Sequence, residues 1–320
     1  MKKRKKRKFL VTGGAGFIGS NIVETLVRMG EGVVVLDNLS EGKLENLSSV
    51  MEKITFMKGD IRSEKDLDRA LRGVHFVLHQ AALRSVPKSM EMPLEYNDVN
   101  VNGTLKLLVK AKEHRIKRLV YASSSSVYGE TRKFPEKEKD LPNPISPYAA
   151  TKLIGEYYCR LFSRSFGLET VSLRYFNVFG PKQSLDNQYA VVIPKFITCI
   201  LDNKNPPIHS DGLQKRDFTF IDNVVQANVA AATARGVSGE VINVACGRAN
   251  TLLDIVKEVN SILGKNIKPV HEPERAGDVK KTLADVTKLK KKLGLSKFIQ
   301  FEDGLKRTVR WFEGNLSAKS

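Results

Sequence analysis

One tyrosine in the chain is followed four residues later by a lysine, and such a pair can act as a general base. The segment ISPYAATK holds the pair, Tyr148 and Lys152. Ser146 and Pro147 are typical of a helix N-cap and first residue, so both side chains fall on one helix face. A lysine ammonium about 5 Å from the phenol offers roughly 3 kcal/mol at an effective dielectric of 20. Bringing a tyrosine pKa from about 10 to neutrality takes roughly 4 kcal/mol, so a second positive charge would complete a phenolate base.

A run of four serines, Ser123 to Ser126, could supply a second reactive group. It ends the apolar stretch RLVYA and precedes Val127 and Tyr128, so it differs from a linker rich in glycine. Two interpretations stay open from the residues alone. The run is either a polar turn at the end of a strand or the source of a catalytic hydroxyl.

A glycine-rich turn, TGGAGFIGS, is the third chemical signal. Gly14, Gly16 and Gly19 fit G-x-G-x-x-G, and Gly13, Gly16 and Gly19 fit a related spacing. Glycines there permit a tight turn and bring a pyrophosphate close to free N–H groups at a helix N-terminus. Asp37 ends the next apolar run and could accept hydrogen bonds from ribose hydroxyls, which favours NAD over NADP.

Asp60 ends the third apolar run, on the same edge of the predicted sheet. It could bind an adenine amino group or be an ordinary turn aspartate.

These groups need a scaffold, and the first 180 residues alternate apolar runs with helical patterns. We predict strands at Phe9–Thr12, Gly32–Asp37, Ile54–Lys58, Val74–His79, Arg118–Ser123 and Thr170–Tyr175. We predict helices at Ile18–Met29, Glu64–Leu71, Leu94–Glu113 and Pro147–Ser165, then at Val191–Asp202, Val224–Arg235, Thr251–Leu263 and Asp303–Glu313. This alternation indicates an α/β fold, a Rossmann-like doubly wound parallel sheet with a smaller C-terminal α/β substrate-binding domain.

The domain boundaries follow from the same rhythm. Residues 1–8 are expected to be a disordered basic tail, and residues 9–180 the NAD-binding domain. Residues 181–320 are expected to form mainly the substrate-binding domain, with roughly 218–245 returning to the first. The first eight residues, MKKRKKRK, carry seven of the net +18 charges. Such a tail is usually solvated, and nonspecific contact with nucleic acid is its alternative role.

Composition excludes several classes of protein. The three cysteines are far apart and form neither a disulfide framework nor a metal spacing, which fits a reducing cytoplasm. No apolar run approaches the roughly 18 residues of a membrane helix. His75 and His79 lie in a predicted strand without H-E-x-x-H, so we expect no metal site.

Together these motifs resemble the extended short-chain dehydrogenase/reductase family, and in particular its UDP-sugar 4-epimerases. Further segments also look like that family, in the same order: HQAALRSVPKS, VNGT, RYFNVFGP, KRDFTFIDN and PERAGDVKKTLAD. The resemblance implies that Tyr148 removes the sugar O4 proton while NAD accepts hydride from C4, and that Ser124 is the catalytic serine. Related dehydratases and decarboxylases carry carboxylates where this chain has Ser125 and Ser126, so those reactions are disfavoured.

The resemblance also assigns the binding residues. Those expected at the cofactor are Gly13, Gly16, Phe17, Ile18, Gly19, Asp37, Asn38, Asp60, Ile61, Ala81, Ala82, Asn100, Ser123, Tyr148, Lys152 and Tyr175. Those expected at the substrate are Arg84, Ser85, Ser124, Asn177, Val192, Arg216, Arg275, Asp278 and Thr282. Two arginines among them, Arg216 and Arg275, can pair with a diphosphate.

The sugar itself stays open. Arg84 resembles the glucose-type enzymes or suits an acidic sugar, whereas the small Thr282 admits an N-acetyl group. We therefore expect a 4-epimerase of UDP-glucose/UDP-galactose that also admits UDP-GlcNAc/UDP-GalNAc, with a UDP-uronic acid 4-epimerase as the alternative. A dinucleotide-sensing regulator is a third interpretation, but such regulators tend to lose the Tyr/Lys pair. The family also implies a homodimer through the helices at 94–113 and 147–165.

Overall fold

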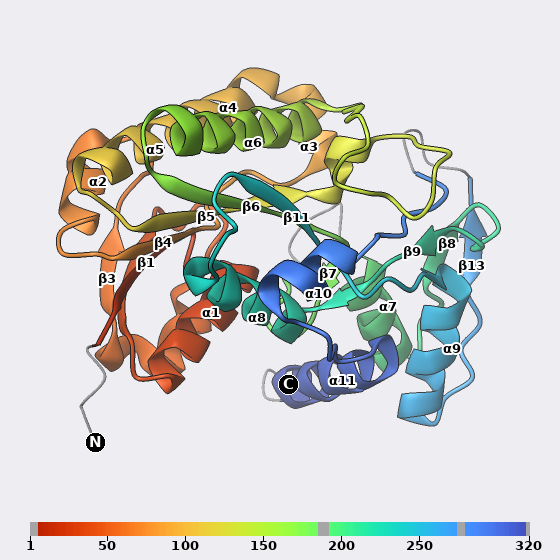
Figure 1. Cartoon of the computed structure of the whole chain (residues 1–320). Coiled ribbons are helices and arrows are strands. Elements are labelled where there is room, and N and C mark those ends of the chain that lie inside the picture. Colours follow the sequence, from red (N-terminus) through yellow and green to blue (C-terminus); the bar gives the residue numbers. More distant parts are fainter. Residues whose placement is uncertain (1–5, 185–191, 274–278, 318–320) are drawn as a thin grey trace.

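A seven-stranded parallel sheet forms the larger lobe of the computed structural model, which describes residues 6–184, 192–273 and 279–317. Its strand order is β11-β6-β5-β4-β1-β2-β3 (Figure 1). The strands are β1 (Lys8–Thr12), β2 (Gly32–Asp37), β3 (Thr55–Lys58), β4 (Phe76–His79), β5 (Arg118–Ser124), β6 (Glu169–Tyr175) and β11 (Glu240–Val244). The predicted doubly wound parallel sheet is confirmed.

Alternate residues of the strands pack into two separate apolar cores, one on each face of the sheet. Leu10 and Val34 belong to one core, and Val11 and Val35 belong to the other. Strands buried on both faces read as continuous apolar runs, which is why the sequence predicted six of the seven closely, whereas β11 was not predicted as a strand.

Helices cover both faces (Figure 1). The helices α2 (Glu64–Ala70), α5 (Gly103–Glu113) and α6 (Pro147–Ser165) supply apolar residues to the core around Leu10. On the opposite face, α1 (Phe17–Arg28) and α8 (Ile221–Thr233) supply the core around Val11.

The helix predicted at 94–113 is interrupted. It is divided into α4 (Pro93–Asn97), a π-helical turn at Asp98–Asn102, and α5. The wide turn contains Asn100, whose side-chain amide binds both the N–H and the carbonyl of Leu83. Such insertions are frequent at functional sites, and here one fixes the loop after β4.

Four short helical segments were not predicted: the 3₁₀ segments η1 (Leu44–Lys53) and η3 (Ser125–Tyr128), and the helices α3 (Val86–Glu91) and α10 (Thr287–Leu293). A few residues of helix carry too little periodicity for detection from sequence alone.

The second lobe packs beside the carboxyl edge of the sheet. It contains α7 (Val192–Leu201), α9 (Leu252–Leu263) and α11 (Phe301–Ser317). Its strands pair as β8 (Pro207–His209) with β13 (Val270–Glu272), β10 (Thr219–Phe220) with β7 (Val178–Phe179), and β12 (Asn250–Thr251) with β9 (Lys215–Arg216). In the chain, α8 and β11 come after α7, β8, β9 and β10 of the second lobe. The chain nevertheless returns to the large sheet, where β11 pairs with β6.

At the N-terminus, β1 begins at Lys8 and Arg7 forms an ion pair with Glu31. The segment predicted as a tail therefore gives its last residue to the sheet.

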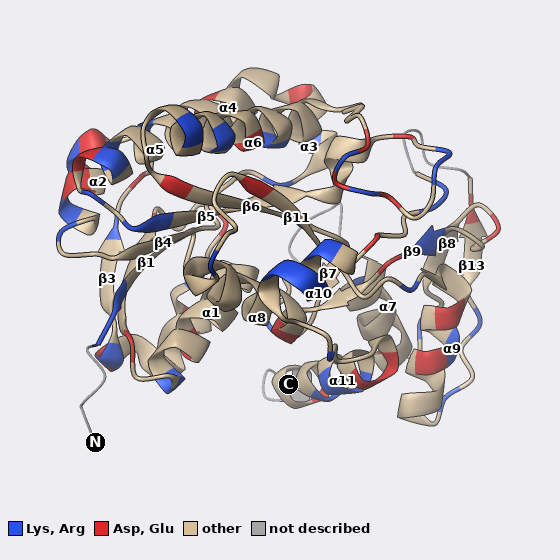
Figure 2. Cartoon of the chain, in the orientation of Figure 1, with Lys and Arg blue, Asp and Glu red and all other residues tan. Residues whose placement is uncertain are grey.

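Charged residues of both signs are spread over most surface helices, while α10 is strongly basic (Figure 2). Lys288 and Lys292 of α10 pair with Glu240 of β11, so part of this charge is neutralised within the fold. Across the described ranges, none of the helices combines the length and apolar character needed to cross a membrane.

Candidate active site

A cavity of about 1730 Å³ runs along the carboxyl ends of the parallel strands. Its wall includes Gly13 after β1, Ala81 after β4 and Ser124 of β5, together with Val192 and Thr282 from the second lobe. Ligands of doubly wound folds bind at this edge, near the point where the strand order reverses. The volume exceeds the roughly 300–1,000 Å³ of ordinary ligand pockets, so it has room for a dinucleotide and a second ligand.

The glycine loop lies between β1 and α1, at one end of this cavity. Gly13 has φ +66°, and a Cβ atom there would lie 2.7 Å from the backbone nitrogen of Ala81. A Cβ atom on Gly19 would lie 2.1 Å from the carbonyl oxygen of Gly13. Gly16 is the N-cap of α1, where no side chain caps the helix. The first turn of α1 therefore offers backbone N–H groups to an anion such as a pyrophosphate.

Asp37, at the end of β2, is a buried carboxylate in the cavity wall. Its Oδ2 accepts from the N–H of Ala15 at 2.9 Å, and its Oδ1 accepts from the N–H of Leu39 at 2.8 Å. Burial raises the pKa of Asp37, and the two N–H donors oppose that effect. Each oxygen keeps a lone pair for a ribose hydroxyl, whereas a 2′-phosphate would be repelled, so the residues present fit NAD.

Asp60 also lines the cavity, but its carboxylate is occupied by protein groups. It forms an ion pair with Arg62 at 2.8 Å and accepts from Asn38 Nδ2 at 3.0 Å. The hydrogen bonds from Arg62 lower the pKa of Asp60 to about 2. Its acceptor capacity is thus largely used within the protein.

The three predicted catalytic residues meet in the cavity wall. Ser124 ends β5, while Tyr148 and Lys152 lie one turn apart on α6. The Nζ atom of Lys152 donates to the carbonyl of Ala122 at 2.9 Å and lies 5.9 Å from the centre of the Tyr148 ring. The Ser146 side chain accepts from the N–H of Ala149, so the N-cap starts α6 at the register that places this pair.

Burial sets the protonation of this group. It raises the pKa of Tyr148, although a hydrogen bond with Ser124 and the charge of Arg84 act in the opposite direction. Burial also lowers the pKa of Lys152 to about 8. In the protein alone the phenol is therefore protonated at neutral pH. Its deprotonation requires an additional positive charge, as the sequence argument also required.

Ser126 orients Ser124, a role that the sequence did not suggest. Its hydroxyl donates to Ser124 Oγ at 2.8 Å, and its backbone N–H donates to the same atom at 3.2 Å. Because Ser124 Oγ accepts both bonds, its own hydrogen is available for Tyr148 or a ligand oxygen. Two members of the serine run thus act together.

Ser123 contacts a buried ion pair beneath the site. Its hydroxyl donates to Glu156 Oε1 at 2.5 Å, and Glu156 pairs with Arg174 at 2.7 Å. Ser123 also lines the cavity, and its side chain joins β5 to the ion pair between α6 and β6.

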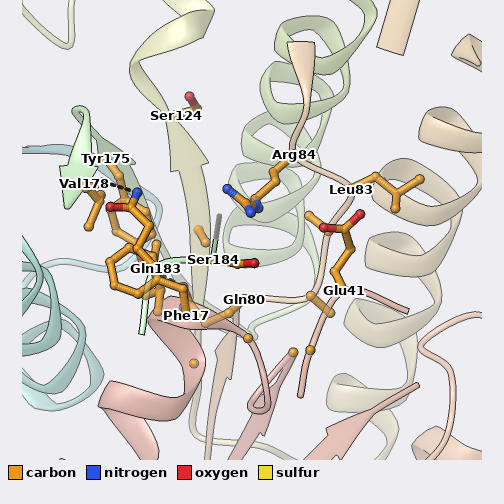
Figure 3. A pocket seen from close by; sticks show the side chains of 18 of the residues that line it. Phe17, Glu41, Gln80, Leu83, Arg84, Ser124, Tyr175, Val178, Gln183 and Ser184 are labelled. Atoms are coloured by element: carbon orange, nitrogen blue, oxygen red, sulfur yellow. Dashed lines mark hydrogen bonds between the residues drawn. The ribbon is translucent and has the colours of Figure 1, made fainter. Parts of the chain in front are cut away.

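Asn100 and Ser85 lie outside the cavity wall. Asn100 is buried and holds the backbone of Leu83. Ser85 is the N-cap of α3 and accepts from the N–H of Lys88. Both fix the loop from which Arg84 reaches into the cavity (Figure 3).

The wall of the second lobe is joined by hydrogen bonds between distant segments. Asn177, which has φ +35°, donates from Nδ2 to Thr282 Oγ1 at 3.0 Å. Asp217 accepts from the N–H groups of Gly247 and Ala284. Glu136 accepts from the N–H of Leu283 at 2.9 Å. Asn177, Glu136 and Thr282 all line the cavity.

Most other predicted residues also line this cavity, and two cannot be placed. The predicted residues that line the cavity and have not been placed above are Gly16, Phe17, Ile18, Gly19, Asn38, Ile61, Ala82, Tyr175 and Arg216. Arg275 and Asp278 lie outside the described residues.

Several polar wall residues were missed, among them Gln80, Glu136 and Gln183. Gln80 binds Tyr175 and Asn228, and Gln183 binds the carbonyl of Val178. Gln80 lies within the segment HQAALRSVPKS and Gln183 follows RYFNVFGP by two residues, so those segments were the available signal, whereas Glu136 lies in a loop without a motif.

The two histidines considered as metal ligands, His75 and His79, form hydrogen bonds within the fold. His79 lies between the hydroxyls of Thr12 and Thr104, and burial lowers its pKa to about 3. His75 Nδ1 accepts from the backbone N–H of Lys8. Across the part of the chain that the structure describes, no three His, Cys, Asp or Glu side chains are grouped to hold a metal ion.

Comparison with known proteins gives a consistent result. Residues 9–245 match the model of the NAD dependent epimerase/dehydratase family. The solved UDP-N-acetylglucosamine 4-epimerase from Methanobrevibacter ruminantium M1, in complex with UDP-N-acetylmuramic acid, is 42% identical with a TM-score of 0.93. That alignment covers 98% of this chain and 100% of the solved chain.

Two similar proteins are named for different sugars. A putative UDP-glucose 4-epimerase of Methanocaldococcus jannaschii is 38% identical, over 96% of this chain and 98% of the relative. A UDP-glucuronate 4-epimerase of Thermodesulfobacterium geofontis is 36% identical, over 96% of this chain and 97% of the relative. Similarity along the whole chain thus extends to enzymes for neutral and for acidic sugars.

Proposed function

The chain belongs to the NAD dependent epimerase/dehydratase family, among its UDP-sugar 4-epimerases, and we propose that its substrate is a UDP-hexose with a neutral sugar, plain or N-acetylated. The observation that carries the proposal is the arrangement of Ser124, Tyr148 and Lys152 in one wall, with serines at 125 and 126. No carboxylate stands at those two positions to remove a sugar proton for elimination.

The residues of the chain have distinct roles in this proposal. When bound, NAD supplies the acceptor for the C4 hydride and a positive ring near the phenol. Tyr148 takes the proton from the sugar O4 and returns it to the epimeric oxygen. Ser124, held by Ser126, bonds to O4 and to the phenol. Lys152 adds a positive charge that favours the phenolate.

The substrate side of the wall favours a neutral sugar. Glu136 is 2% exposed and lies beside Thr282, because it accepts from the N–H of the following residue, Leu283. Burial raises the pKa of Glu136 to about 7, so above that pH a sugar carboxylate in that region would face a like charge. The small Thr282 leaves room in the wall for an acetamido group.

Arg84 supports a second candidate, a UDP-uronic acid 4-epimerase. Its guanidinium reaches into the cavity (Figure 3). The charge of Arg84 also lowers the pKa of Tyr148, against the effect of burial. The cation could pair with a sugar carboxylate. It could equally attract a phosphate, so its presence does not decide between the sugars.

Parallel assays separate the candidates. Purified protein is incubated with UDP-galactose, UDP-GalNAc or UDP-glucuronate, and the C4 epimers are separated by chromatography. We expect turnover of one or both neutral substrates at least tenfold faster than that of UDP-glucuronate. Preferential turnover of UDP-glucuronate would replace the main proposal by the second candidate, and conversion of none would refute both.

Tyr148→Phe tests the base. The loss of the phenol hydroxyl should lower kcat by about 10²–10⁴-fold while bound NAD and the far-UV circular dichroism stay unchanged. Tyr158→Phe, which removes a hydroxyl from the same helix outside the cavity wall, should keep full activity. A Tyr148→Phe enzyme with normal kcat would exclude Tyr148 as the base.

A homodimer through α5 and α6 is part of the same proposal. Val109 of α5 and Tyr157 and Leu161 of α6 are exposed apolar residues, and the two helices pack side by side (Figure 1). Two copies of this face would cover these side chains. Light scattering during gel filtration should give twice the mass of the chain, and a monomer across micromolar concentrations would contradict this.

A further inference from the structure

The ammonium of Lys152 lies over two aromatic rings, and one of them belongs to a residue that the catalytic arrangement does not use. Its Nζ atom is 5.9 Å from the centre of the Tyr148 ring, and 5.2 Å from the centre of the Tyr121 ring on β5. Both distances lie within the roughly 6 Å over which the face of a ring attracts a cation. Tyr121 is 1% exposed, so it can act on the site only through its neighbours.

The ring of Tyr121 fits beneath α6 where the helix has no side chain. A Cβ atom on Gly155 would lie 2.2 Å from the hydroxyl oxygen of Tyr121 and 2.8 Å from a carbon of its ring. Glycine inside a helix is less favourable than alanine, so the sequence gives up helix stability at the place where this ring passes. Lys152 and Gly155 are three residues apart and share one face of α6. The ring is therefore fixed beneath the turn that carries the lysine.

The hydroxyl of Tyr121 does not explain why the fold keeps a tyrosine here. It is buried and has no hydrogen-bond partner among the described residues. A buried hydroxyl without a partner loses its hydration and gains nothing in return. The ring is the part of Tyr121 that has partners, since it lies under the cation of Lys152 and 5.7 Å from the ring of His79.

Charged groups near Lys152 do not take the place of the ring. Lys152 is 4% exposed, and among the described residues its Nζ atom donates to one acceptor, the carbonyl of Ala122. Glu156 lies one turn further along α6, but its carboxylate is paired with Arg174 of β6. Arg84 of the cavity wall is itself a cation, so it cannot attract the ammonium.

The other titratable neighbours are uncharged near neutral pH. Burial raises the pKa of Cys159 to about 12 and lowers the pKa of His79 to about 3. Burial also raises the pKa of Tyr121 well above its ordinary value. An ionisation near neutrality in this group therefore belongs to Tyr148 or Lys152.

We propose that Tyr121 is a positioning residue, whose ring face keeps Lys152 as an ammonium beside the phenol of Tyr148. Burial alone favours the neutral amine, which would give the phenol no positive charge. The ring offsets part of that cost and, unlike a carboxylate, brings no negative charge that would oppose the phenolate. The inference rests on the proposed role of Tyr148 as the base and does not depend on which UDP-sugar reacts.

The ionisation of Tyr148 can be followed without turnover, because a phenolate absorbs at longer ultraviolet wavelengths than a phenol. Purified full-length protein with bound NAD and no sugar is titrated from about pH 5 to about pH 9, and the step that is missing from Tyr148→Phe belongs to Tyr148. Tyr121→Met replaces the ring by an unbranched apolar chain. It should raise the midpoint of this step by about half a unit to one unit, a three- to tenfold change in the ionisation constant. Tyr121→Leu serves the same purpose if the methionine variant does not fold.

Two further variants separate the ring from its hydroxyl and from packing in general. Tyr121→Phe keeps the ring and removes the hydroxyl without a partner, so it should keep the wild-type midpoint and an equal or higher melting temperature. Phe162→Leu reduces another buried aromatic residue of the same core, on α6. It should lower the melting temperature and leave the midpoint unchanged.

Three results would overturn the inference. The midpoint could stay at the wild-type value in Tyr121→Met and Tyr121→Leu. It could move as far in Tyr121→Phe, because the hydroxyl would then be the active group, or as far in Phe162→Leu, because packing alone would then explain it. A wild-type protein without a Tyr148 step would refute the proposed base and this inference with it, whereas a step that no Tyr121 variant moves refutes this inference alone.

Discussion

The two halves of the cavity are built in different ways. The cofactor half consists of the glycine loop and the ends of β1 and β2, and its contacts join neighbouring segments, as when Asp37 accepts from the N–H of Ala15. The substrate half consists of the wall around Glu136, Asn177, Asp217 and Thr282. Its contacts span much greater distances in sequence, such as the 147 positions between Glu136 and Leu283.

The same difference is seen in the hydrogen bonds that a buried carboxylate accepts in each half. Both oxygens of Asp37 accept a backbone N–H from its own strand–loop–helix unit. Asp217 instead joins its own segment to two distant ones, since it accepts from Cys246 and Gly247 in one and from Ala284 in the other. The cofactor half therefore forms with one supersecondary unit, whereas the substrate half forms only when distant segments assemble.

Asp217→Ala should have the largest effect of the changes considered, and it should impair the substrate half while leaving the cofactor half intact. It leaves the N–H groups of Cys246, Gly247 and Ala284 without their acceptor, at about 1–3 kcal/mol for each buried group. We expect a loss of stability of about 3 kcal/mol or more, measured by urea unfolding. The KM for the UDP-sugar should rise at least tenfold, while the NAD content stays near that of the wild type.

Asp303→Ala is the matched control, because Asp303 is exposed in the first turn of α11. Its stability should change by less than about 1 kcal/mol. If Asp217→Ala lost NAD as readily as it lost affinity for the sugar, the two halves would not be separate units.

The same difference explains what the sequence could predict. Six strands of the large sheet, the glycine loop and the pair Tyr148 and Lys152 depend on local periodicity and helix capping, so their positions were foreseeable. Glu136 depends on a pairing with Leu283 across two loops, which no local pattern encodes. The π-helical turn at Asn100 was missed for a related reason, since its purpose is a tertiary contact with Leu83.

Gly19→Ala should damage the cofactor half instead. The added Cβ atom would lie 2.1 Å from the carbonyl oxygen of Gly13, so the loop must shift. Overpacking of this kind costs about 1–3 kcal/mol. We expect the affinity for NAD to fall roughly five- to a hundredfold, measured by retention of the dinucleotide during dialysis.

Gly314→Ala provides the control for that change. Gly314 lies in α11 with no atom within 4 Å of an added Cβ, so alanine there should be neutral or slightly stabilising. A Gly19→Ala protein that retained NAD as well as the wild type would show that the loop can widen without cost.

Glu136→Gln should give the smallest effect, a change in how the stability of the protein depends on pH. Burial raises the pKa of Glu136 from its ordinary 4.5 to about 7, and the nearby Asp217 and Asp140 add to this, while Arg174 opposes it. The folded protein therefore binds this proton more tightly than the unfolded chain. Its contribution to stability is complete below about pH 4.5 and is lost as the pH rises through 7.

Glutamine keeps an oxygen for the N–H of Leu283 but does not titrate, so the variant escapes this loss. The difference in melting temperature, variant minus wild type, should become more positive from pH 4.5 to 7 and then level off. Glu130→Gln, at an exposed position of the same loop, should give no such trend. A pH-independent difference for Glu136→Gln would mean that folding does not raise the pKa of Glu136. The contrast between one backbone donor at Glu136 and two at Asp37 would then carry no energetic weight.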